Sequence, residues 1–104
     1  MSLTQTIRVN KLIDLYGKLI TAKQYNIVYE YFCLNNSLSE ISENYAISRQ
    51  AVNYTIKQVV DILEGYESKL QLLAKYDKVN SVVNEVVKSK DVSLVATITD
   101  ILEE

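Results

Sequence analysis

The sequence contains no histidine, no proline and no tryptophan, and only two glycines and one cysteine among its 104 residues. A single cysteine cannot form an internal disulfide, and zinc is bound chiefly by cysteine and histidine, so neither a disulfide framework nor a metal site is expected. Histidine is also the usual acid or base near neutral pH. Its absence, together with the lack of a recognisable catalytic motif, predicts that the protein is not an enzyme and uses no cofactor.

The few glycines and the short apolar runs exclude further classes. Gly17 and Gly65 lie too far apart to build a phosphate-binding loop or a dinucleotide fingerprint. No apolar run approaches the roughly 18 to 20 residues of a membrane span, and the N-terminus lacks the apolar segment of a secretory signal. We therefore predict a cytoplasmic protein without a membrane partner, in which Cys33 beside Phe32 is a small buried hydrophobe.

What is present is helical periodicity. Apolar residues recur at three- and four-residue spacing, which together with the missing prolines predicts an all-α fold. One stripe runs through Leu12, Leu15, Tyr16, Leu19 and Ile20. Thr21 and Ser37 are expected to cap the next two helices, Ser37 with Glu40 in a capping box. Turns are predicted at residues 35–36 and 89–91.

A long stripe follows Ser48, the next expected cap. It consists of Val52, Ile56, Val59, Leu63, Tyr66, Leu70 and Leu73, which is a heptad spacing. It keeps its register across Gly65, so we predict one continuous helix over residues 49–78, about 45 Å long at 1.5 Å per residue. The seam over 52–73 packs either on the helices around Val82 and Ile98 or on a second chain. We favour a homodimer, because such a helix would protrude from a compact monomer.

These elements predict one helical domain over residues 1–104. Residues 1–66 would form its core, and residues 67–104 a C-terminal extension for dimerisation or packing. The role of residues 79–104 is left open.

Residues 37–57 have the layout of a helix-turn-helix. A short helix would bury Leu38 and Ile41, a turn would place Ile47 beneath it, and a second helix would bury Val52 and Ile56. The turn position that often holds glycine is occupied here by Ala46, and left-handed geometry there would cost alanine about 1 kcal/mol.

The second helix of this pair supplies the candidate DNA-binding residues. They share side chains that can reach base edges or phosphates: Ser48, Arg49, Gln50, Asn53, Tyr54 and Lys57, with Lys23 on an earlier helix. Residues 1–57 carry a net charge of +2 and residues 58–104 a net charge of −4, which sum to the −2 of the whole chain. The basic side chains thus concentrate in the half that holds the motif, but the overall charge predicts weak DNA binding by a monomer.

Several blocks in a fixed order carry a family resemblance. They are residues 10–16, 19–24, 37–43, 48–52, 56–57 and 66–70, and in order and spacing they resemble the bacterial YlxM family of helix-turn-helix proteins over residues 3–78. The helix-turn-helix is also similar to region four of the sigma-seventy factors. The resemblance implies a cytoplasmic bacterial DNA-binding regulator linked to the signal recognition particle pathway.

Residue by residue, the resemblance places Ser48–Val52 at the opening of the family's recognition helix and Lys57 at its basic residue one turn later. Gln58 stands where relatives usually have a second cation, and the Asn53-Tyr54 pair where an acidic residue is common nearby. Loss of that cation lowers the electrostatic share of affinity. The alternative to DNA binding is a protein-interaction adaptor of the protein-targeting machinery, in which the acidic C-terminal half binds the partner.

Overall fold

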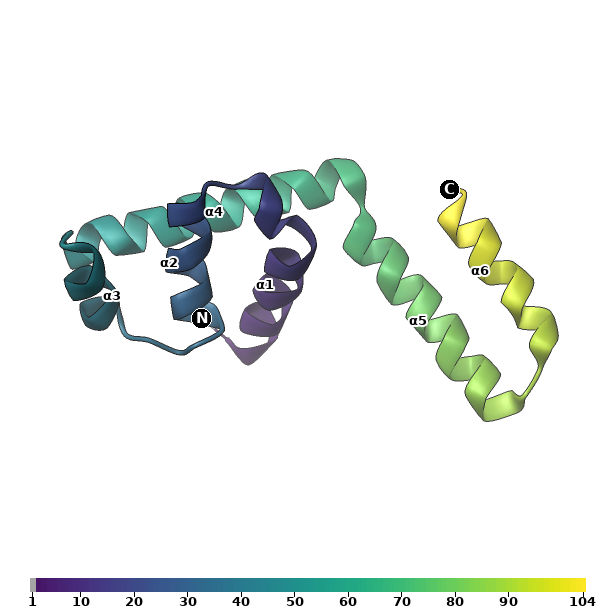
Figure 1. The fold of residues 1–104 in the computed structure, drawn as a ribbon. Coiled ribbons are helices and arrows are strands. Elements are labelled where there is room, and N and C mark those ends of the chain that lie inside the picture. Colours follow the sequence, from purple (N-terminus) through teal and green to yellow (C-terminus); the bar gives the residue numbers. More distant parts are fainter. Residues whose placement is uncertain (1) are drawn as a thin grey trace. The chain divides into compact units, whose positions relative to one another are not determined.

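Helices form all the regular structure in the computed structural model, which describes residues 2–104 (Figure 1). The predicted all-α fold is confirmed. In chain order the elements are α1 (Leu3–Tyr16), the 3-10 helix η1 (Gly17–Leu19), α2 (Ala22–Phe32), α3 (Leu38–Tyr45), α4 (Arg49–Leu70), α5 (Leu72–Ser89), the 3-10 helix η2 (Val92–Leu94) and α6 (Val95–Leu102). None of the helices in the described part of the chain is long and apolar enough to cross a membrane.

The first three α-helices begin with the same local device. Ser2, Thr21 and Ser37 each accept a hydrogen bond from the backbone amide three residues later, and the side chain of that later residue accepts one from the capping residue's amide. Such a capping box satisfies two amides that a helix leaves without partners. The predicted caps at Thr21 and Ser37 are confirmed.

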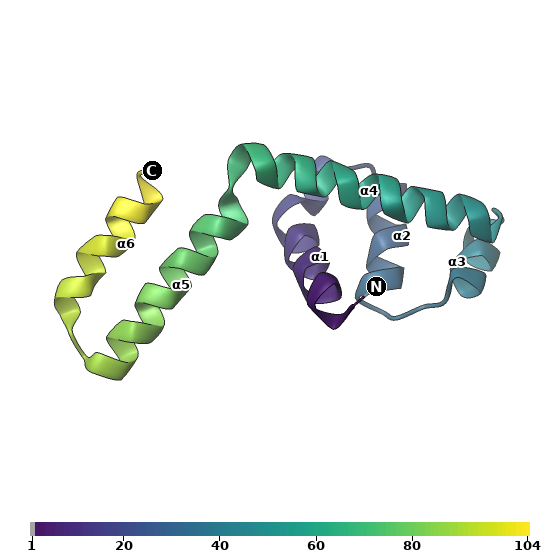
Figure 2. The same cartoon turned by 180° about the vertical axis from the view of Figure 1, so that it is seen from behind.

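Helices α1 to α4 form one compact unit, which extends to Leu70. Helix α4 packs against each of the other three, and Figure 2 shows it lying across α1 and α2 with α3 at its start. The core of this unit consists of Val9, Leu12, Ile13, Tyr16, Ile27, Val28, Phe32, Ile41, Val52, Ile56, Val59 and Leu63.

Most residues of the heptad seam belong to this core. Val52, Val59 and Leu63 have no exposed surface, and Ile56 has 3%. The helices of their own unit bury these side chains, so they are not available to a second chain. The expectation that the homodimer forms through residues 52–73 is therefore wrong over this stretch of the seam.

The predicted continuous helix over 49–78 is also wrong, because it is interrupted at Gln71. This residue has left-handed backbone angles, φ 54° and ψ 31°, and separates α4 from α5. Gly65 does not interrupt α4, as expected. The heptad spacing therefore continues past Leu70 in the sequence, whereas the helix itself ends at that residue.

Helices α5 and α6 form the second compact unit, Gln71–Glu104, and run antiparallel (Figure 1). The ammonium of Lys75 donates to the backbone carbonyl of Glu104 over 2.8 Å, which ties the start of α5 to the end of α6. Lys90, with φ 57°, ends α5 and confirms the turn predicted at 89–91. Asp91 opens η2 by accepting a 3.0 Å hydrogen bond from the amide of Ser93.

Expectations about burial fail near several helix ends, for Cys33 and Leu19 and also for Leu15 and Leu70, which are 38% and 47% exposed. Cys33 is exposed, because α2 ends at Phe32 and the cysteine is its C-terminal cap, with its thiol donating to Oδ1 of Asn10 at 3.4 Å. Leu19 is 52% exposed, because α1 ends at Tyr16 and the following 3-10 turn shifts the phase of the stripe.

Candidate nucleic-acid interface

The turn between α3 and α4 has the geometry that a helix-turn-helix requires. Ala46 adopts φ 54° and ψ 42°, and its amide donates to the carbonyls of Ser42 and Glu43, which closes α3. The amide of Ile47 donates to the carbonyl of Ser42 at 3.1 Å. Ala46 thus adopts the left-handed geometry that glycine often supplies at this turn position, with an intrinsic cost of about 1 to 2 kcal/mol.

Helix α4 starts where the sequence predicted. The hydroxyl oxygen of Ser48 accepts a 3.0 Å hydrogen bond from the amide of Ala51, and its carbonyl accepts the first helical bond from Val52. Val52 and Ile41 of α3 are both completely buried, and they anchor the two helices in the core. Ser48 therefore serves mainly as the N-terminal cap of α4. Only the hydrogen-bonding capacity of its hydroxyl that the cap does not use is directed outward.

The first turns of α4 present the predicted side chains outward. Arg49, Gln50, Tyr54 and Lys57 are exposed, and Asn53 is half-buried. At 100° per residue, Gln50, Asn53 and Lys57 fall within an arc of about 60°, with Arg49 and Tyr54 on its two flanks. The structure thus gathers five of the seven predicted residues on one helical surface beside their cap Ser48. We call residues 49, 50, 53, 54 and 57 the α4 face.

Lys23 lies outside this group. It is exposed on the first turn of α2, a different helix. Its neighbour Gln24 is engaged in the capping box, where its side chain accepts the amide of Thr21 at 3.0 Å.

The α4 face continues onto the start of α3. A shallow depression of about 530 Å³ is lined by Ser37, Leu38, Ser39, Arg49, Gln50 and Asn53. Sequence reasoning did not assign Ser37 or Ser39 to the site. A signal for them was present, because the capping box that marks the start of α3 also marks a helix N-terminus, where backbone amides point out of the helix. Helix N-termini attract phosphate through these amides and the helix dipole. Glu40 limits this attraction, because its carboxylate already accepts the amide of Ser37 at 3.2 Å.

A hydrogen-bond cluster fixes the end of α3 that precedes the turn. The carboxylate of Glu30 on α2 accepts the hydroxyl of Tyr45 at 2.5 Å and the amide nitrogen of Asn44 at 3.0 Å. The hydrogen bond to Glu30 is the main reason why the pKa of Tyr45 is raised to about 12. Helix α3 is thus held to α2 immediately before the chain turns into α4.

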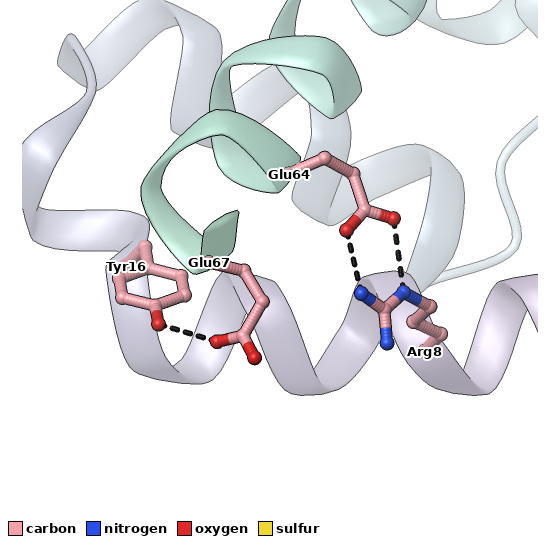
Figure 3. Close-up of polar contacts among 4 residues, drawn as sticks. All are labelled: Arg8, Tyr16, Glu64 and Glu67. Atoms are coloured by element: carbon pink, nitrogen blue, oxygen red, sulfur yellow. Dashed lines mark hydrogen bonds and ion pairs between the residues drawn. The ribbon is translucent and has the colours of Figure 1, made fainter. Parts of the chain in front are cut away.

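The electrostatic character of α4 changes along its length. Arg49 and Lys57 carry the positive charge of its first turns, and Asp61 is exposed one turn after Lys57. Further along, Glu64 accepts from Nε and Nη2 of Arg8 at 2.9 and 2.7 Å (Figure 3). This bidentate pair lowers the pKa of Glu64. The cationic part of the helix therefore ends before Asp61, after about two turns.

The side chains of the α4 face offer hydrogen-bond donors, hydrogen-bond acceptors and cations. In the described chain, residues 2–104, no three His, Cys, Asp or Glu side chains cluster in a way that could hold a metal ion.

Comparisons with known proteins give a consistent result. Residues 3–101 match the UPF0122 family, described as "Putative helix-turn-helix protein, YlxM / p13 like". The chain is 46% identical over 81 residues to a UPF0122 protein of Latilactobacillus sakei, which covers 78% of this chain and 72% of the relative. It is 39% identical to YofM of Lactococcus lactis over 97% of this chain and 93% of the relative. Against YlxM of Bacillus subtilis the identity is 43%, over 83% of this chain and 78% of the relative.

Proposed function

The chain belongs to the UPF0122 family of YlxM / p13-like helix-turn-helix proteins, and from this premise we propose that it is a regulatory protein that binds duplex DNA through the α4 face. One observation carries the proposal. The side chains of the α4 face combine cations and amides, point away from the core, and extend from a helix whose other side is completely buried. This is the arrangement of a recognition helix that enters a major groove.

Each side chain has a role suited to its chemistry. Arg49 and Lys57 contact phosphates or a guanine edge, while Gln50 and Asn53 have the bidentate amides that pair with adenine. Tyr54, which is 67% exposed, lies at the flank and contacts the sugar-phosphate backbone. Ser48 and the first amides of α3 supply further phosphate contacts, and Lys23 contacts a phosphate outside the groove.

We extend this proposal in two ways. The protein acts as a homodimer, because two recognition helices about 34 Å apart contact successive major grooves and double the contacts of a monomer. The regulated process is the signal recognition particle pathway in the cytoplasm, as the resemblance of the sequence to the YlxM family suggests.

The test is fluorescence anisotropy of the purified chain with labelled duplexes from the region upstream of its own operon, between about 50 and 200 mM salt. We expect saturable binding that prefers one fragment. Each phosphate contact contributes a slope of about −0.9 to the dependence of log K on log salt, so Lys57→Gln should reduce the slope by about 1. Arg49→Ala combined with Lys57→Ala should abolish the preference.

Lys88→Gln provides the matched control, because it removes the same charge from an exposed position on α5. It should leave both affinity and slope close to those of the unchanged protein. If a folded chain binds none of the fragments at tens of micromolar, or if Lys57→Gln and Lys88→Gln have equal effects, the proposed role of the α4 face is wrong.

The second candidate is an adaptor that binds a component of the protein-targeting machinery. The net charge of −4 over residues 58–104 favours it, since this half would repel DNA and attract a basic protein surface. Adaptor binding should survive the double substitution of Arg49 and Lys57, whereas DNA binding should not. A pull-down with the double variant therefore separates the two functions.

A further inference from the structure

The C-terminal unit buries little of its own apolar surface. Within residues 71–104 only Leu73 and Ile101 are buried. The unit is also shorter than the roughly 40 residues below which a fold usually needs a disulfide, a metal or a partner chain. A pair of helices with so small a core needs further apolar contacts to remain ordered.

Unused apolar surface is present on α5. Its inner side is half-buried at Val79, Val82 and Val86, next to α6. A second stripe remains outside, and its members are Leu72, 44% exposed, Tyr76, 59%, Val83, 40%, and Val87, 70%. These four recur at i, i+4, i+11 and i+15, a helical spacing that aligns them along one side.

Helix α6 has an equivalent stripe. Ile98 and Ile101 turn toward α5, whereas Val95 and Leu102 are 48% and 61% exposed. On each helix the exposed stripe is rotated from the inner side by about 80° in the same sense along the chain. Because the two helices run antiparallel, equal rotations bring both stripes to the same side of the hairpin. We call residues 72, 76, 83, 87, 95 and 102 the hairpin face.

The other side of α5 is polar and charged. It carries Asp77, Ser81, Glu85 and Lys88, all exposed. The hairpin is thus a layer of two helices with a polar, solvent-exposed side and an apolar side. The apolar side requires a second layer of secondary structure to cover it.

We infer that the hairpin face is the homodimer interface, on which a second copy of this chain packs its own hairpin face to form an antiparallel four-helix bundle. The pattern on α5 is self-complementary. In an antiparallel pairing centred between Val79 and Asn80, Leu72 falls opposite Val87 of the second copy and Tyr76 opposite its Val83. A two-fold axis requires this kind of correspondence.

Charge also permits the pairing. The charged residues of α5 all lie outside the hairpin face, and the nearest of them, Lys75, is rotated from the centre of that face by about 90°. An identical copy packed on the hairpin face therefore meets no charged side chain of α5 and encounters no repulsion along this helix. The inference deepens the homodimer part of the proposed function and replaces the seam over 52–73 as the interface.

The first experiment measures mass without DNA, so that it is independent of the DNA-binding proposal. In sedimentation equilibrium the unchanged chain should have twice its mass of 11.9 kDa at micromolar concentration. Val83→Glu places two charges in the interface and should raise the dimer dissociation constant by about 100-fold or more. Ser81→Glu is the matched control, since it adds the same charge to the same helix on the polar side and should leave the dimer intact.

A second experiment covers the case in which Val83→Glu unfolds the hairpin. In a Cys33→Ser background, equimolar chains carrying Tyr76→Cys or Val83→Cys are treated with a short bis-maleimide. Antiparallel pairing should link the two different chains preferentially over two identical ones. A monomeric unchanged chain at hundreds of micromolar, equal dissociation constants for the Val83→Glu and Ser81→Glu variants, or links mainly between identical chains would each overturn the inference.

Discussion

The phenolic hydroxyl of Tyr16, the last residue of α1, donates a 2.6 Å hydrogen bond to the carboxylate of Glu67 in the last turn of α4 (Figure 3). The two residues are 51 positions apart in the sequence, and both side chains are buried. A buried carboxylate is stable only when its hydrogen bonds are made. The pair therefore fixes the C-terminal end of α4 on α1.

Tyr16→Phe should lower the free energy of unfolding by about 1.5 to 3 kcal/mol, because it removes a buried donor to a charged group and leaves the ring in place. Urea denaturation followed by circular dichroism measures the loss. Tyr66→Phe is the control, because the Tyr66 hydroxyl donates to the carbonyl of Leu19 in an exposed position and its removal should cost less than about 1 kcal/mol. Equal losses in the two variants would contradict the importance of the buried pair.

Ala46→Gly should stabilise the protein by about 1 kcal/mol, since glycine has no Cβ to strain the left-handed turn between α3 and α4. Ala51→Gly is the opposite test on the same chain. Ala51 lies in helical backbone, where glycine should destabilise by about 1 kcal/mol. Thermal unfolding of both variants checks the two signs, and a loss of stability in Ala46→Gly would show that the turn is not strained.

Gly65→Ala should also stabilise the protein, by about 1 kcal/mol, because Gly65 lies inside α4 and a Cβ added there would meet no atom within 4 Å. The matched change at Gly17 should have the reverse effect. A Cβ there would lie 2.8 Å from Cε2 of Tyr25, so the ring would have to move. Melting temperatures of the two single variants provide the measurement, and the prediction fails if both move in the same direction.

Glu64→Gln should make stability less dependent on pH in acid. Arg8 holds the pKa of Glu64 below its ordinary value of 4.5, so the ion pair contributes stability above that pH. The contribution is lost as the pH falls through the lowered pKa. Because both side chains are partly exposed, we expect a difference below about 1 kcal/mol at pH 7 that disappears near pH 2.

Urea titrations of the Glu64→Gln variant and the unchanged chain at several pH values measure this difference. A difference for Glu64→Gln that grows in acid would contradict the assignment of the ion pair.

The sequence predicted the elements whose causes are local. The caps Thr21, Ser37 and Ser48 lie where their side chains placed them. Helix starts are determined by nearby hydrogen bonds, and such bonds leave a recognisable pattern of residue types.

The break at Gln71 could not be predicted in this way. Glutamine has no preference for left-handed geometry, and the heptad spacing continues through Leu70 and Leu73. The exposure of Cys33 could not be predicted for a related reason. The end of α2 depends on how the following loop leaves the core, and this path has no local signal in the sequence. At the candidate site, side-chain type predicted the residues of the α4 face, whereas the position of Ser39 beside Arg49, Gln50 and Asn53 depends on the packing of α3 beside α4.

The position of α4 in the chain has a consequence for synthesis. Helices α1, α2 and α3 are made first, each with a start that its own capping box defines, yet each packs against α4. During translation the first three helices therefore emerge from the ribosome before the element that completes their shared core. We therefore expect the nascent chain to complete this core only after Glu67, which pairs with Tyr16, has left the exit tunnel, and the α4 face to become ordered in that same step.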